Sequence, residues 1–214
     1  MTSGDPHPAV RWSRDAWVLV RPAAAFRFIA ANPAIGSPLR LLCGRPAFVA
    51  FVLGCVVSLA ATGTLTARLV FPAPLYWAVV PLVEIAALAV ALPRRSARIS
   101  FPGAVDAFFT GHAAWTLCLV GLVTSLALVA PTLWWTLMTR VGVPGLLLVL
   151  LWSLYTDFCF FRFVIGSSPR AAAWAVALHR AVSWAVVALI FAIPALSPAG
   201  IAREIVEVVR EVLP

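Results

Sequence analysis

The sequence contains no lysine, and acidic residues are scarce. Its 214 residues include 16 basic residues, all of them arginine, and 8 acidic ones, which gives a formal net charge of +8. Only 11% of the residues are charged and 63% are apolar, whereas soluble domains average about 25% charged and about 45–50% apolar residues. These proportions exclude a soluble globular enzyme, a disordered tail and a disulfide-stapled secreted module, and they favour an integral membrane protein.

Sequence motifs of nucleotide, metal and redox chemistry are also absent. Neither GxGxxG, a Walker loop nor HExxH occurs, and the four cysteines (Cys43, Cys55, Cys118 and Cys159) form no CxxC pair. We expect these cysteines to be small buried apolar residues. The sequence therefore predicts a protein without catalytic activity, cofactor or metal.

Long apolar runs predict an all-α fold with five transmembrane helices. A bilayer core about 30 Å thick needs roughly 20 apolar residues per helix. The predicted spans are Ala47–Thr66, Pro72–Leu92, Ala113–Ala130, Val143–Val164 and Ala171–Ala195. Pro46 is expected in the first turn of the first span, and Ser-Pro pairs at Ser37, Ser168 and Ser197 are expected to begin helices. No cleavable signal peptide is evident, because the first apolar run starts near residue 47.

The placement of arginine predicts the orientation. Eleven arginines fall in segments on the N-terminal side of the membrane, four fall in the opposite segments, and Arg180 lies within a span. The positive-inside rule then favours a bacterial inner membrane protein with a cytoplasmic N-terminus and a periplasmic C-terminus. The arginines expected to face an anionic inner leaflet are Arg11, Arg14, Arg21, Arg27, Arg94, Arg95 and Arg98. Because this basic charge flanks apolar runs, it does not indicate nucleic acid.

The predicted organisation has three parts. Residues 1–46 form a cytoplasmic or interfacial segment, 47–196 the five-helix bundle, and 197–214 an outer-face amphipathic C-terminal helix. The N-terminal part contains two amphipathic stretches, expected to lie on the lipid surface; docking of a cytosolic partner is the alternative. The inner loop Pro93–His112 is expected to contain a short amphipathic helix, and the outer loop Pro131–Arg140 to lie along the outer interface.

Ionisable residues inside the predicted spans are the candidate site. Counting about 1.5 Å per residue places Glu84, Asp157, His179 and Arg180 at one level, roughly 10–14 Å above the inner boundary. Such groups are functional candidates by default. They form either a charge-compensated clamp between helices, a proton or ion relay, or a pocket for a ligand or lipid headgroup. His112 is expected to be an interfacial residue.

Stripes of small residues predict where helices pack. Gly54, Ser58 and Thr62 recur every four residues in the first span, and Ala173, Ala177 and Ala181 do so in the fifth. Such stripes let helix backbones approach closely. Pro81 is expected to kink the second span near Glu84.

Three short stretches stand out beside the five-span layout: Trp17–Pro22 (WVLVRP), Ala25–Ile29 (AFRFI) and Asp106–Ala113 (DAFFTGHA). Together with that layout, they resemble the bacterial Yip-type membrane proteins. The resemblance implies a non-enzymatic membrane scaffold and assigns no functional residue. We therefore expect a scaffold or accessory subunit of a larger membrane complex. A small transporter or channel component using the buried Glu/Asp/His/Arg cluster is the alternative, and a lipid-modifying membrane enzyme ranks last.

Overall fold

The computed structural model describes residues 9–33, 36–62, 64–92, 99–129, 131–193, 200 and 203. Every element within these residues is a helix, as the apolar runs predict. The elements in chain order are α1 (Ala9–Val20), α2 (Pro22–Ala31), α3 (Pro38–Thr62), α4 (Ala67–Val70), α5 (Ala73–Trp77), α6 (Val79–Ala91), α7 (Phe101–Thr110), α8 (Ala113–Leu128), α9 (Pro131–Leu137), η1 (Met138–Gly142), α10 (Val143–Cys159), η2 (Phe160–Val164) and α11 (Pro169–Ala192).

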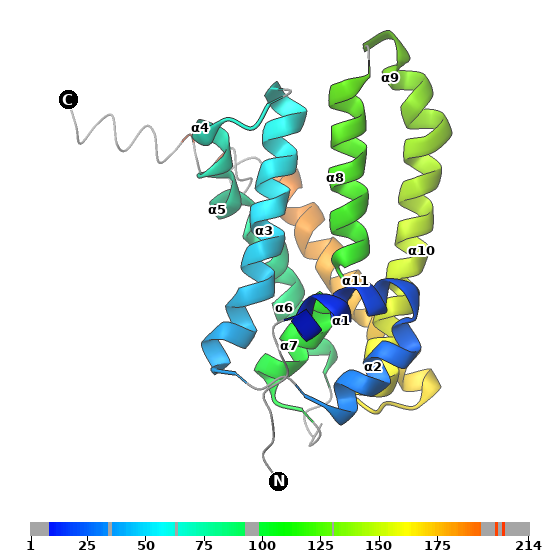
Figure 1. Ribbon diagram of the computed structural model, residues 1–214. Coiled ribbons are helices and arrows are strands. Elements are labelled where there is room, and N and C mark those ends of the chain that lie inside the picture. The colour runs from blue at the N-terminus through cyan, green and yellow to red at the C-terminus, as the bar shows by residue number, and fades with distance from the viewer. Residues whose placement is uncertain are drawn as a thin grey trace, which may run out of the picture.

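The long helices run side by side along one axis (Figure 1). We call the end that carries α1, α2, α7 and η2 the basal end, and the end that carries α4 and α9 the distal end. Four stretches are long and apolar enough to cross a membrane: Pro38–Leu59, Pro74–Ala91, Leu133–Val164 and Pro169–Ile190. The pair α7 and α8, bent by 41° at its break, would make a fifth. The chain is thus built as a multi-pass membrane protein.

Two of the predicted helix bounds are wrong. The first long helix begins at Pro38, not Ala47, so that Pro46 lies inside it rather than in its first turn. A helix does begin at the Ser37–Pro38 pair, as expected, but it is the long helix itself, and Ser37 Oγ accepts a hydrogen bond from the backbone N–H of Arg40 (3.3 Å). The predicted outer loop Pro131–Arg140 is helical, because α9 and η1 continue into α10 as part of one 32-residue span.

The apolar core lies at the basal end. Its largest fully buried side chains are Phe26, Phe108, Phe160, Phe161 and Leu88, which come from four different elements. The rings of Phe108 and Phe160 meet edge-to-face with centroids 5.4 Å apart, and Phe26 meets Phe160 at 6.0 Å. Large exposed apolar residues are frequent on the distal parts of α8 and α10, so the bundle is tied together mainly at its basal end.

The N-terminal helices belong to this basal core. Val18 of α1 and Phe26 of α2 are buried, and Arg45 of α3 forms ion pairs with Asp15 of α1 (2.5 Å) and Asp106 of α7 (3.0 Å). The amphipathic stretches predicted in residues 1–46 therefore pack against the bundle through one face. The predicted C-terminal helix lies outside the described residues except for its residues 200 and 203.

Candidate functional site

The first half of the site is an ion pair between α10 and α11. Arg180 donates from Nε to Asp157 Oδ2 (2.8 Å), and its Nη2 lies 2.5 Å from the same oxygen. Nη2 also donates to Ser153 Oγ (3.3 Å), one turn before Asp157. The side chains of Arg180 and Asp157 are only 13% and 5% exposed. Two predicted residues thus meet and neutralise each other's charge inside the bundle.

The second half joins α6 to the turn between α7 and α8. Glu84 Oε2 lies 2.5 Å from His112 Nε2, and the carbonyl oxygen of Glu84 lies 3.3 Å from His179 Nε2. His112 is a residue that the sequence reasoning missed, since it was expected at the interface. Its exposed fraction is only 8%.

The turn between α7 and α8 explains how His112 reaches Glu84. Gly111 and His112 form the break at which the two helices bend. A Cβ on Gly111 would lie 2.9 Å from Thr156 Cγ2, so the missing side chain lets this turn approach α10 closely. The turn is thereby held inside the bundle rather than at its surface. An apolar segment such as Phe101–Thr110 directly before a Gly-His turn was the available signal.

Aromatic rings fix the two imidazoles. Phe109 stacks on His112 with centroids 4.6 Å apart, and Phe108 meets His112 and His179 edge-on at 5.1 and 4.7 Å. His179 has no exposed surface. The four residues predicted to share one level, joined by His112, therefore lie together next to the aromatic core.

The backbone around the site departs from regular α-helix in two places. A π-helical segment, η2, begins three residues after Asp157 and ends at Val164, two residues before Gly166, whose φ of 79° favours glycine. Arg162 Nη1 donates to the carbonyl oxygen of Ser167 (2.7 Å) and closes this end. Near Glu84, α5 and α6 are separated at Ala78, and Pro81 lies in the first turn of α6, where its missing N–H costs little. In place of the kink expected near Pro81, the helical stretch is interrupted between α5 and α6 at Ala78, three residues before Pro81.

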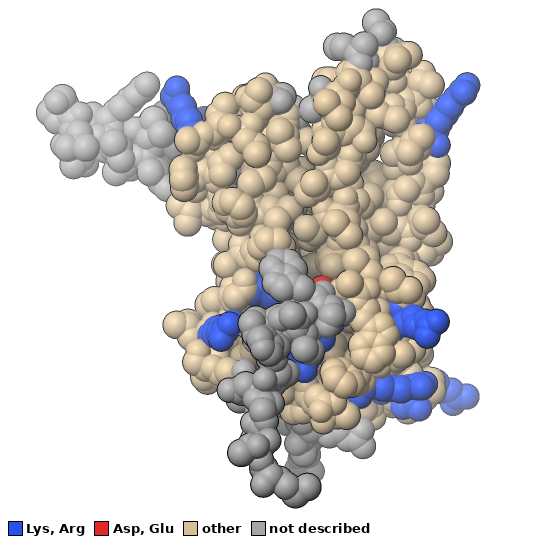
Figure 2. Space-filling view, viewed as in Figure 1, with Lys and Arg blue, Asp and Glu red and all other residues tan. Residues whose placement is uncertain are grey.

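A cavity of about 280 Å³ opens beside the paired charges. It lies between α3, α6, α8 and α11, and it is lined by Glu84, His112 and Arg180 together with apolar side chains such as Leu53 and Trp184. On the face seen in Figure 2, the surface is hollowed between the parts formed by α3 and α8, and acidic residues are almost absent.

Three buried polar atoms of the site have no hydrogen-bond partner within the described residues. They are Nδ1 of His112, Nδ1 of His179 and Oγ of Ser183. Ser183 lies one turn after His179 on the same face of α11, and both side chains are nearly fully buried. Buried polar groups of this kind require an explanation such as a bound water or ligand.

Of the small residues in the first span, Gly54 lies at a close helix contact. A Cβ on Gly54 would lie 2.8 Å from Pro74 Cδ, so glycine allows α5 to lie against α3. Ser58 is buried and donates to the carbonyl oxygen of Thr64 (3.1 Å). Thr62 is exposed and donates to the carbonyl oxygen of Ser58 (2.9 Å).

The stripe of the fifth span does not pack against the rest of the chain. Ala173, Ala177 and Ala181 are all exposed, and the buried face of α11 is formed instead by Ala172, Val176, His179 and Ser183. These alanines therefore supply no packing face toward the rest of the described chain, and their role in helix packing stays a prediction. Residues two positions apart lie about 200° around a helix, so a buried His179 turns Ala177 and Ala181 outward.

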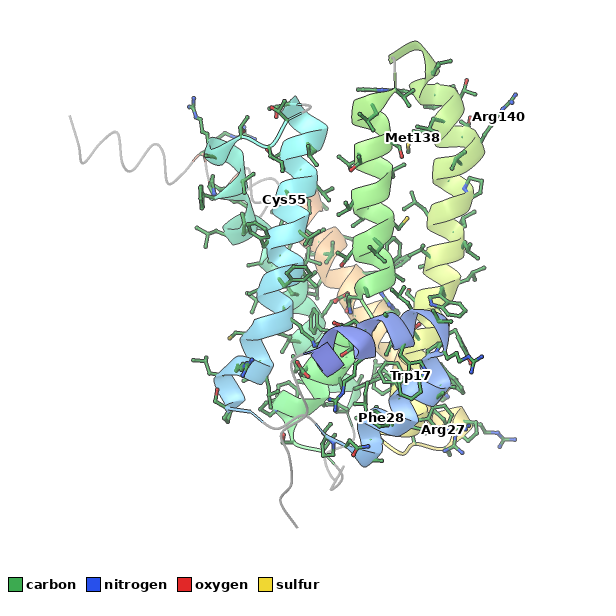
Figure 3. The ribbon with its side chains drawn as sticks, viewed as in Figure 1. Trp17, Arg27, Phe28, Cys55, Met138 and Arg140 are labelled. Carbon is green, nitrogen blue, oxygen red and sulfur yellow. The ribbon has the colours of Figure 1, made fainter. Side chains whose placement is uncertain are left out.

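The basic residues gather toward the basal end in Figure 2. Arg21 and Arg27 are exposed there, and the guanidinium of Arg27 lies over the ring of Phe163 at 4.5 Å. Arg14 is partly buried, with its guanidinium 5.6 Å from the ring of Phe28. Figure 3 shows Phe28 beside Trp17 at the basal end, and Arg140 pointing outward at the distal end. The side chain of Arg11 and residues Arg94, Arg95 and Arg98 lie outside the described residues.

Comparison with protein-family models, with curated proteins and with solved structures finds no match to this chain. Within the described residues, no group of three or more His, Cys, Asp or Glu side chains is arranged to hold a metal ion. The chemistry that the site offers is therefore that of paired charges beside a cavity inside a membrane bundle.

Proposed function

We propose that this protein is a non-catalytic scaffold or accessory subunit of a larger complex in a bacterial inner membrane. The observation that carries the proposal is the exposed alanine face of α11, formed by Ala173, Ala177 and Ala181. In membranes, such faces allow a second helix to approach closely, and this is a main source of helix association there. Only 17% of the residues in the most apolar stretch of this span are buried within the chain.

The long helical stretch Leu133–Val164 offers a second open surface. Of the most apolar stretch within Leu133–Val164, only 11% is buried, against 33% for Pro38–Leu59. Leu147, Leu148 and Leu151 are all more than half exposed. Lipid or other membrane subunits would cover these faces. Coverage by either would account for the small buried fraction of this stretch within the chain itself.

The paired charges support a holding role. Asp157 with Arg180 ties α10 to α11, and Glu84 with His112 ties α6 to the start of α8. Charges buried in a membrane are tolerated when they are paired, and such pairs fix which helices lie together. A subunit that presents fixed outer faces to a partner needs its own helices to be held in fixed relative positions in this way.

The orientation that we propose places the basal end in the cytoplasm. The exposed Arg21 and Arg27 are basal, whereas Arg68 and Arg140 are near the distal end. Basic side chains near an anionic leaflet gain on the order of 1 kcal/mol each. The resemblance of the sequence to Yip-type proteins is compatible with this layout and with a scaffold role, and membership in that group is part of the proposal.

Co-purification with matched variants tests the proposal. The tagged protein is expressed at native level, extracted in mild detergent and analysed by quantitative mass spectrometry as wild type, Ala177→Trp and Leu178→Trp. Leu178 is a neighbouring exposed residue, 43% exposed, and serves as the control. We expect one membrane protein to accompany the wild type and the control in constant ratio and to fall at least tenfold with Ala177→Trp. Purification of the wild type as a lone species, or retention of the partner by Ala177→Trp, would contradict the proposal.

A second candidate function is a small transporter or channel component. The specific observation in its favour is that Glu84, His112 and Arg180 line a cavity between four helices. Ionisable groups in such places form proton and ion pathways in transport proteins. The test is flux of protons and small organic ions in vesicles containing the wild type or Glu84→Gln. Absence of flux, or flux that Glu84→Gln leaves unchanged, rejects this candidate.

A further inference from the structure

The cavity between α3, α6, α8 and α11 has polar residues at one end and apolar residues at the other. We propose that it binds a single-chain amphiphile with an anionic head, such as a long-chain carboxylate, with the head at Arg180 and the chain pointing toward the distal end. The proposal is independent of both functions above, because a scaffold subunit and a transporter could each hold such a molecule.

The order of residues along each helix creates this polarity. α6 runs from the distal to the basal end, whereas α8 and α11 run from basal to distal (Figure 1). One turn on the distal side of Glu84 lies Val80, and one turn on the distal side of Arg180 lies Trp184. Both are cavity-lining residues. The cavity therefore has a charged floor on its basal side and apolar walls above it.

Donor groups at the floor are available to an anion. Within the described residues, Arg180 uses Nε and Nη2 for Asp157 and Ser153, and Nη1 has no acceptor. His112 also lines the cavity, but its Nδ1 is buried without a partner among the described residues, so the donor at the floor that the cavity exposes is the guanidinium of Arg180. A head with two oxygens can accept from donors of this kind, and hydrogen bonds between charged groups are stronger than neutral ones.

The acidic residues near the floor are already occupied. Glu84 lines the cavity with its carboxylate against His112 at 2.5 Å. Asp157 is bound by Arg180 and does not line the cavity. His179 contacts the backbone of Glu84 and has no exposed surface. The acids are thus neutralised by their partners, and an anion meets the free edge of Arg180.

The walls and the opening fit a hydrocarbon chain from the bilayer. Val49, Val52 and Leu53 of α3 and Leu119 of α8 line the cavity, and Trp184 of α11 lines it as well while remaining 57% exposed. Trp184 thus connects the cavity with the outer surface of the bundle, where lipid chains lie. A volume of about 280 Å³ is at the small end of the range of roughly 300–1,000 Å³ for ligand pockets, which favours one chain over a two-chain lipid.

The test measures binding of radiolabelled palmitate to the purified full chain in a neutral detergent. Unlabelled palmitate, hexadecanol and the anionic phospholipid phosphatidylglycerol are the competitors. We expect saturable binding, with palmitate competing at least tenfold better than hexadecanol because only the carboxylate engages Arg180. Equal competition by palmitate and hexadecanol would overturn the anionic head. Stronger competition by phosphatidylglycerol would overturn the single chain.

Two tryptophan variants on α6 locate the site. Val80→Trp places a large side chain at the apolar end of the cavity, where Val80 lines it. Val90→Trp adds the same side chain on an exposed face of the same helix, where Val90 is 61% exposed. We expect palmitate affinity to fall at least tenfold in the first and to stay unchanged in the second. The double variant Arg180→Gln/Asp157→Asn keeps charge balance and should abolish the preference of palmitate over hexadecanol. Unchanged binding in Val80→Trp overturns the location, and the wild-type competition remains decisive if that variant does not fold.

Discussion

Removing Arg180 should destabilise the bundle more than removing the whole ion pair. In Arg180→Met, Asp157 stays buried at 5% exposure and loses both contacts from the guanidinium, at 2.8 and 2.5 Å. Ser153 does not replace them, because its hydroxyl donates to the carbonyl oxygen of Leu150 (3.0 Å). The carboxylate is then left without a donor in an apolar surrounding.

The expected magnitude follows from this loss. Breaking a buried ion pair by removing one partner costs about 3–5 kcal/mol, and a lone acid in mid-membrane costs about 2.5–3.5 kcal/mol on insertion scales. We expect Arg180→Met to lower the free energy of unfolding by about 3 kcal/mol. The double variant Arg180→Met/Asp157→Leu replaces the pair by apolar side chains and should stay within about 1 kcal/mol of the wild type.

The assay is reversible unfolding in mixed micelles of a mild detergent and dodecyl sulfate, followed by far-UV circular dichroism. Arg170→Met is the matched control, since Arg170 lies in the first turn of the same helix and is exposed. It should change the unfolding free energy by less than about 0.5 kcal/mol. A double variant as unstable as Arg180→Met, or less stable, would refute the role of Asp157 as a charge held by Arg180.

Three other results are expected. Gly54→Ala forces α3 and α5 apart and should lower the unfolding free energy by about 1–3 kcal/mol. The control Gly121→Ala, whose added Cβ has nothing within 4 Å, should not lower it, and equal losses in the two variants would contradict the close contact. Arg45→Gln should speed amide hydrogen exchange in α1. Because its ion pairs are partly exposed, the variant should lower the global free energy of unfolding by only about 1 kcal/mol or less. Unchanged exchange in α1 would show that these ion pairs do not hold that helix. Cys43 is exposed, although it was expected to be buried, and an impermeant maleimide should reach it only from the cytoplasmic side. In the double variant Cys43→Ser/Thr139→Cys the new thiol should react only from the other side, and the reverse pattern would overturn the proposed orientation.

Most of the helices could be predicted because an apolar run long enough to cross a membrane seldom occurs unless it forms a transmembrane helix. The third and fifth predicted spans start at or within two residues of α8 and α11. Ser168 begins α11 as expected, its Oγ accepting from the N–H of Ala171 (3.3 Å). The Ser37–Pro38 pair also begins a helix as expected, but the start of the first span at Ala47 was wrong. Pro46 was taken as a first-turn residue, although a proline can lie inside a helix when the surrounding packing compensates for the lost hydrogen bond.

The site could be predicted in part. Counting residues from the inner ends of the spans placed Glu84, Asp157, His179 and Arg180 at one level in the membrane. Such a count cannot show which acidic side chain pairs with which basic one. It also assigned His112 to the interface, because counting assumes straight helices that begin at the membrane surface. The bend of 41° between α7 and α8 carries this residue inward, and such a bend depends on tertiary packing around Gly111.

The two faces of α11 allow the two proposals to be separated. His179 and Ser183 face the interior near the cavity, and Ala177 lies about 200° away from His179 on the outer face. Substitutions at sites that share no contacts usually have additive effects. Ala177→Trp should therefore lower partner association without changing palmitate binding, and Val80→Trp should do the opposite. A double variant whose losses are not additive would indicate that the outer face and the cavity are coupled through α11, and a purely passive scaffold would then no longer describe the protein.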